Sequence, residues 1–153
     1  MLRLGEQMAN LLSGKQTVLA VMPGAEDRVL LKNIFAGSDY RLRFLRSFPR
    51  KRTASRLECV GAVLTDVQLA DNSSWKDVLH EIDRISNPPP LIVSSRLADE
   101  ALWAEVLNLG GHDVLAKPFD RKEVLHAVSM ACIFRRKQAS SFSPQAKVRW
   151  SVA

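Results

Sequence analysis

The 153-residue chain has few of the residues that build metal centres or disulfide frameworks, with only two cysteines and three histidines. Cys59 and Cys132 are far apart and lie in apolar stretches, where a free cysteine usually behaves as a small hydrophobic residue. His80, His112 and His126 show no i, i+4 spacing and no motif glutamate partner. These absences argue against a histidine or cysteine metal centre and against a disulfide scaffold.

Long hydrophobic runs and nucleotide or hydrolase motifs are also missing. No apolar run approaches the about 20 residues of a membrane span, and the N-terminus lacks a secretion signal. Ser94 and Ser95 lack the Gly-x-Ser-x-Gly elbow, and Gly110-Gly111 indicates the end of a helix rather than a phosphate loop. We therefore expect a cytoplasmic protein that does not contact the membrane and is not an enzyme.

Acidic residues are missing from the segment Arg41–Arg56, which supplies much of the net charge of +6. A second basic cluster lies near the C-terminus. The basic residues of the two clusters are Arg41, Arg43, Arg46, Arg50, Lys51, Arg52 and Arg56, and Arg135, Arg136, Lys137, Lys147 and Arg149. Such clusters attract nucleic acid or an acidic protein surface, or they are simply solvated faces.

What the chain does contain is an alternation of apolar strands and amphipathic helices, in a composition (46% hydrophobic, 25% charged) typical of a globular domain. The predicted strands are Thr17–Met22, Tyr40–Leu45, Val60–Thr65, Pro90–Ser95 and His112–Ala116. The predicted helices are Met1–Leu12, Glu26–Phe35 with Val29, Leu30 and Ile34 on one face, a short helix at Pro49 after a Ser47 cap, Trp75–Ile85 capped by Ser73 or Ser74, Ala98–Leu109, and Asp120 to about Arg136.

This alternation predicts an α/β fold: a three-layer α/β/α sandwich around a five-stranded parallel sheet in the flavodoxin-like order 2-1-3-4-5. The segment Tyr40–Leu45 alternates apolar residues with arginine, which suits an edge strand. Groups at the carboxyl ends of parallel strands converge on one crevice. Asp66, Ser95 and Lys117 each follow or end a strand, so we expect them to meet there.

The strand-terminal Asp66 and Ser95, together with Lys117-Pro118-Phe119 after the fifth strand, resemble the receiver domain of bacterial two-component response regulators. The resemblance covers roughly Gln16–Lys137 and implies a CheY-like fold. It divides the chain into an N-terminal helical extension (1–15), a receiver-like domain (16–137) and a basic C-terminal tail (138–153).

The resemblance implies a specific chemistry. In that family the aspartate at the position of Asp66 accepts a phosphoryl group from a histidine kinase. A magnesium ion and the lysine at the position of Lys117 hold the negative charge of the phosphoryl oxygens. Ser95 takes the position of the residue that swings to the phosphoryl group, and the bond Lys117-Pro118 is expected to be cis.

The chain departs from the family at the end of the first strand. Two adjacent acids hold magnesium there in the family, but the corresponding residues are Met22 and Pro23, which cannot ligate a hard cation. Glu26, Asp27 and Asp71 are the acids that could substitute for them. We therefore expect no cofactor, with magnesium only if these nearby acids rescue the site.

A second departure concerns signal output. The aromatic switch position in the fifth strand is Val114, so coupling to the face made by the fourth and fifth helices (Ala98–Leu109 and Asp120 to about Arg136) would be weakened. We therefore interpret the chain as a stand-alone atypical receiver in phosphorelay signal transduction, with phosphorylation of Asp66 impaired or lost. It would act by protein–protein interaction, with a histidine kinase, a downstream partner, or a second copy bound through those helices.

Three alternatives stay open from the sequence. The pair Asp66 and Lys117 could be a structural ion pair with no signalling role. The chain could be a basic adaptor that binds nucleic acid through Arg41–Arg56 and the C-terminal tail. It could also be a small enzyme that uses Asp66 and Lys117 as an acid–base pair, although nothing in the sequence suggests a substrate.

Overall fold

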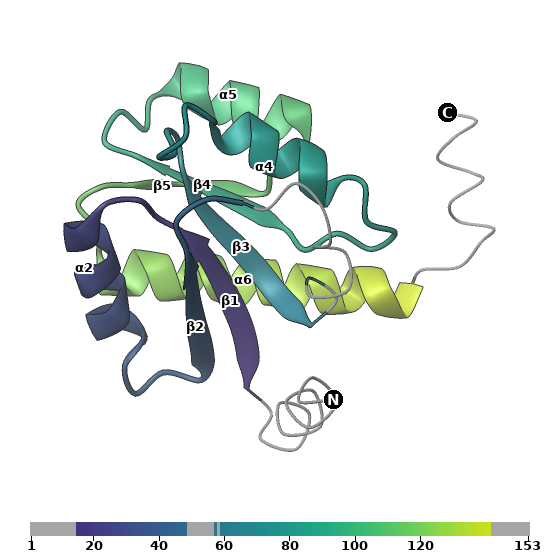
Figure 1. Ribbon diagram of the computed structural model, residues 1–153. Coiled ribbons are helices and arrows are strands. Elements are labelled where there is room, and N and C mark those ends of the chain that lie inside the picture. Colours follow the sequence, from purple (N-terminus) through teal and green to yellow (C-terminus); the bar gives the residue numbers. More distant parts are fainter. Residues whose placement is uncertain (1–14, 49–56, 58, 142–153) are drawn as a thin grey trace.

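The structure is a computed structural model that describes residues 15–48, 57 and 59–141 (Figure 1). Its strands are β1 (Gln16–Val21), β2 (Tyr40–Leu45), β3 (Val60–Asp66), β4 (Leu91–Ser95) and β5 (Asp113–Ala116). Its helices are α2 (Ala25–Phe35), α4 (Trp75–Ile82), α5 (Glu100–Leu109) and α6 (Arg121–Ser141). The helices predicted at Met1–Leu12 and Pro49, and the tail after Ser141, lie outside the described residues. None of the helices described is long and apolar enough to cross a membrane.

The five strands form one parallel sheet in the order β2-β1-β3-β4-β5, which confirms the predicted fold. Helices α2 and α6 cover one face of the sheet, and α4 and α5 cover the other (Figure 1). Because all strands run the same way, their carboxyl ends lie along one edge of the sheet.

The central strands are buried on both faces, which explains their continuous apolar sequences. In β1, Val18 and Ala20 enter the core under α2 and α6, whereas Leu19 and Val21 enter the core under α4 and α5. The edge strand β2 behaves differently. Its inward residues Tyr40, Leu42 and Phe44 pack against the core under α2 and α6, and its arginines are exposed.

Two burial predictions were wrong. On α2 the inward residues are Leu31, Ile34 and Phe35, whereas Val29 and Leu30 are 60% and 36% exposed. The buried stripe of α2 begins at Leu31 and continues at i+3 and i+4 with Ile34 and Phe35, so Val29 and Leu30 lie on the exposed side of the helix. Cys59 is exposed because it lies in the turn before β3, while Cys132 is buried on α6 as expected.

Helix ends follow local hydrogen bonding. Ser74, not Ser73, caps α4 in a capping box with Asp77. That helix ends at Ile82 rather than Ile85, because the Ile85 amide donates to the Ile82 carbonyl and tightens the last turn.

At the other end of the chain, α6 continues past Arg136 to Ser141. The buried Arg135 fastens this helix by donating to the carbonyl oxygens of Leu57 and Asn87 at 3.0 Å each. The part of α6 near Arg135 is therefore tied to the segments that lead into β3 and β4.

Candidate functional site

A lysine and two carboxylates form the candidate site at the carboxyl ends of the strands. Asp66 is the last residue of β3, and Lys117 follows β5. The Nζ atom of Lys117 lies 2.7 Å from Oδ2 of Asp66, so the predicted ion pair is present. The other carboxylate oxygen of Asp66 accepts a hydrogen bond of 2.8 Å from the Val67 amide, which fixes its orientation.

Asp27, in the first turn of α2, completes the cluster. Its Oδ2 atom also lies 2.7 Å from Nζ of Lys117. The lysine side chain is 6% exposed and each carboxylate 19% exposed, so a nearly buried ammonium bridges two partly buried acids. Of the acids proposed as substitutes, Asp27 therefore reaches the site, while its neighbour Glu26 is exposed.

The turn between β1 and α2 holds Asp27 in place. Arg28 donates from Nη1 to the carbonyl oxygens of Met22 and Pro23, at 3.0 Å each. A Cβ atom at Gly24 would lie 3.1 Å from Oδ2 of Asp27, so the glycine leaves room for the carboxylate to reach Lys117. Sequence reasoning missed Arg28, because no motif marks a long side chain that folds back on its own turn.

Ser95 lies beside the cluster without joining it through its hydroxyl. Its carbonyl oxygen accepts from the Lys117 amide at 3.0 Å, which ties the lysine loop to the end of β4. Its Oγ atom accepts from the Leu97 amide at 3.0 Å. The neighbouring Ser94 is buried and donates to the Thr65 carbonyl, so it joins β4 to β3.

The loop that carries Lys117 has the features that the resemblance implied. The Lys117-Pro118 peptide bond is cis, and Phe119 is buried with its ring centroid 5.9 Å from Nζ of Lys117. Val114, at the switch position in β5, is buried in the core under α4 and α5. As a small, buried side chain it has no ring to move between the core and the surface.

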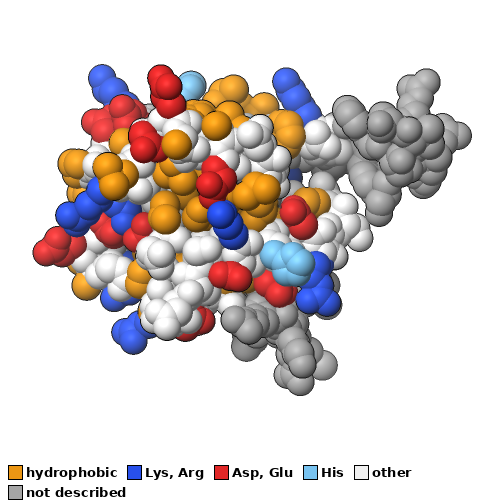
Figure 2. All heavy atoms as spheres, turned by 90° about the horizontal axis from the view of Figure 1, so that it is seen from above, with side chains coloured by type: hydrophobic (Ala, Val, Ile, Leu, Met, Phe, Trp, Pro, Cys, Tyr) orange, Lys and Arg blue, Asp and Glu red, His pale blue; other side chains and the backbone are white. Residues whose placement is uncertain are grey.

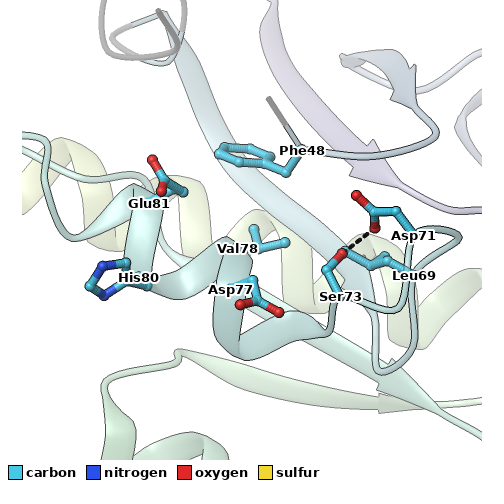
Figure 3. A pocket seen from close by; sticks show the side chains of 8 residues that line it. All are labelled: Phe48, Leu69, Asp71, Ser73, Asp77, Val78, His80 and Glu81. Atoms are coloured by element: carbon cyan, nitrogen blue, oxygen red, sulfur yellow. Dashed lines mark hydrogen bonds between the residues drawn. The ribbon is translucent and has the colours of Figure 1, made fainter. Parts of the chain in front are cut away.

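Asp71 lines a pocket of about 240 Å³ beside α4 (Figure 3). Its carboxylate accepts a hydrogen bond from the Ser73 hydroxyl, and the two side chains face each other on the loop after β3. The residues that line this pocket are Phe48, Leu69, Asp71, Ser73, Asp77, Val78, His80 and Glu81. They include none of the three residues of the lysine cluster, and the described residues Asp27, Asp66 and Asp71 do not form a group that could hold a metal ion.

The side chains of the cluster do not fit a magnesium ion as they stand. Magnesium requires near-octahedral oxygen coordination, and the site offers the carboxylates of Asp27 and Asp66. Both already bind Lys117, and the buried, apolar Met22 takes the position where a further acid would be needed. In the described part of the chain no group of three or more acidic, histidine or cysteine side chains could hold a metal.

Comparison with known proteins supports the fold. No protein-family model and no curated protein sequence matches the chain. The signal receiver domain of a LuxO repressor protein from Vibrio parahaemolyticus superposes with a TM-score of 0.71 at 18% identity, covering 84% of this chain and 98% of that one.

Two further solved structures are similar. The receiver domain of a sensor histidine kinase from Pseudomonas aeruginosa, which holds magnesium in its cleft, gives a TM-score of 0.63 at 21% identity over 77% of this chain and 98% of that one. A CheY-like receiver domain from Methanospirillum hungatei gives 0.65 at 15% identity over 81% and 98%. The chain therefore has the receiver-domain (CheY-like) fold.

Proposed function

We propose that the protein is an atypical receiver module of two-component signalling that acts by binding other proteins, with magnesium-dependent phosphorylation of Asp66 impaired or lost. The observation that carries this proposal is the cluster of Asp27, Lys117 and Asp66 at the strand ends, with Met22 and Pro23 in place of the adjacent acids.

Charge explains why phosphorylation would be slow. The resemblance implies that the site of a conventional receiver domain has three carboxylates and one lysine. Its formal charge of about −2 attracts a divalent cation. Here two carboxylates share one ammonium, so the formal charge is about −1 and a cation must compete with Lys117 for both acids. Without the cation, less of the charge on a transferring phosphoryl group would be neutralised.

The surface over α5 supports action by protein binding. Although α5 is largely apolar, only Val106 is fully buried. Trp103, Leu107 and Leu109 are 39%, 48% and 49% exposed, and Leu97 before the helix is 77% exposed. Hydrophobic side chains gather on this face of the molecule (Figure 2). Exposed apolar surface of this kind is typical of an interaction site.

Helix α6 lies on the other side of the edge strand β5 and complements α5 in charge. It exposes Met130 and Phe134, and the His112 ring after α5 lies 5.1 Å from that of Phe134. The charged residues of α5 are both acidic, whereas α6 is basic at its start and before its end. In a symmetric dimer, α5 of each copy could pack on α6 of the other with matched charges. We propose this face, bordering β5, as the contact with a second copy or a signalling partner.

The test of the proposal is intact-protein mass spectrometry after incubation with a small-molecule phosphodonor, with and without magnesium. We expect the wild-type protein to gain no adduct, or to gain it far more slowly than a conventional receiver domain treated in parallel. A rapid, magnesium-dependent adduct that disappears in Asp66→Asn would overturn the proposal, because it would mean that Asp27 completes a working metal site.

A further inference from the structure

Three exposed arginines, Arg41, Arg43 and Arg46, form an arginine row on the edge strand β2 and directly after it. Arg41 and Arg43 belong to β2, and Arg46 follows the strand directly. Among the residues that the structure describes, none of them has a hydrogen-bond or ion-pair partner. Since an arginine without a carboxylate partner leaves its five N–H donors to solvent, the row is free to bind an anion.

The alternation of β2 sets the spacing and direction of Arg41 and Arg43. Tyr40, Leu42 and Phe44 pack into the core under α2 and α6, so Arg41 and Arg43 point to the opposite face of the sheet. Leu45, the next residue on that face, packs into the core under α4 and α5, and Arg46 follows at the end of the strand. Side chains two residues apart on a strand are separated by about 6.6 Å. Within the described residues β2 pairs only with β1, so this edge of the sheet is open along the strand.

The surroundings of these arginines also favour the binding of an anion. The sequence has no acid from Tyr40 to Leu57, and β2 presents no large exposed hydrophobic side chain. A protein interface normally has apolar anchors at its centre, which this edge lacks. A nucleic-acid backbone needs none, because its affinity comes from cations that replace condensed counterions. Guanidinium groups also match phosphate oxygens in bidentate geometry, and all three residues are arginine rather than lysine.

We propose that the β2 edge is a sequence-independent docking surface for a nucleic-acid backbone, in which Arg41, Arg43 and Arg46 each contact a phosphate. This goes beyond the proposed signalling function and does not depend on the state of Asp66. Three phosphate contacts would give weak binding that falls steeply with salt.

The test measures the fluorescence anisotropy of a labelled DNA duplex across a KCl series, with the full chain. We expect the triple variant Arg41→Gln, Arg43→Gln, Arg46→Gln to lose most of the affinity at low salt, and the slope of log K against log salt to become shallower by about 2.7. Circular dichroism melting checks that the exposed substitutions leave the fold intact.

The matched control is Arg96→Gln, Lys122→Gln, Arg136→Gln, which removes the same charge from three other exposed positions. We expect this variant to keep nearly the wild-type slope. Equal losses in both variants would mean that net charge alone drives binding and would overturn the proposal. Absence of binding at low salt would overturn it as well, and so would equally tight binding of a poly-glutamate peptide of matched charge.

Discussion

At the residue scale, the central feature is one ammonium shared by two carboxylates. Lys117 is more deeply buried than either acid, so it has exchanged its hydration for two hydrogen bonds of 2.7 Å. Removing one acid leaves the lysine with a partner. Removing the lysine leaves two carboxylates close together with no cation between them, which is the more costly change.

We predict that Lys117→Met lowers the free energy of unfolding by about 3 kcal/mol, whereas Asp27→Asn lowers it by only about 1 kcal/mol. Urea denaturation followed by circular dichroism measures both values. The matched control is Lys76→Met on the exposed pair Lys76–Glu105, which should cost less than about 1 kcal/mol. An equal cost for Lys117→Met and Lys76→Met would show that the cluster does not stabilise the fold.

A second residue-scale prediction concerns the thiols. Burial raises the pKa of Cys132 to about 11, despite the opposing effects of Arg136 and Arg135, whereas Cys59 is exposed. Because the thiolate is the reactive form, Cys132 should stay inert in the folded protein at mildly alkaline pH. Titration with Ellman's reagent should detect one thiol in the native protein and two in denaturant. A native Cys59→Ser variant that still reacts promptly would contradict this.

The residues of the site show which contacts could be predicted from the sequence and which could not. The pairing of Asp66 with Lys117 could be predicted because the carboxyl ends of parallel strands lie along one edge of the sheet. Asp27 was only one of three substitute acids, since its position depends on the Arg28 contacts and on the space at Gly24. Neither leaves a periodic signal in the sequence.

At the element scale, strands and helices were predictable where periodicity and end signals agreed. Strand β2 has the predicted bounds, and α5 ends at Leu109 before Gly110 as expected. The errors arose where an apolar residue was taken as inward without a check on its place in the helical stripe, as for Val29 and Leu30. They also arose where a turn continued the apolar pattern of a helix, as after Ile82 in α4.

The end of α5 offers an element-scale prediction. Gly110 has a φ of 107°, and a Cβ atom added there would meet nothing within 4 Å. The cost of Gly110→Ala is therefore backbone strain alone, and we predict a loss of about 1–2 kcal/mol in unfolding free energy. Gly110→Asn should cost less, because asparagine adopts left-handed conformations more readily. A thermal melt in which alanine and asparagine are both neutral would contradict the predicted strain.

At the scale of the whole molecule, the two sides of the fold differ in what they expose. The face around α5 is apolar and flanked by acids, whereas the β2 edge is basic and lacks large exposed hydrophobic side chains. β2 and β5 are the opposite edges of the sheet, so the two surfaces lie far from each other in strand order. If both proposed surfaces bind, a partner at one of them would therefore leave the other free.

The apolar face gives the last prediction. If α5 of one copy packs on α6 of another, a charge at the exposed Leu107 would be placed in the middle of that contact without disturbing the core. We predict that the protein of 17.1 kDa sediments as a dimer at high concentration, and that Leu107→Glu sediments as a monomer with an unchanged melting temperature. Val29→Glu, on the exposed face of α2, is the control and should leave the dimer intact. A wild-type protein that stays monomeric at high concentration would contradict this prediction.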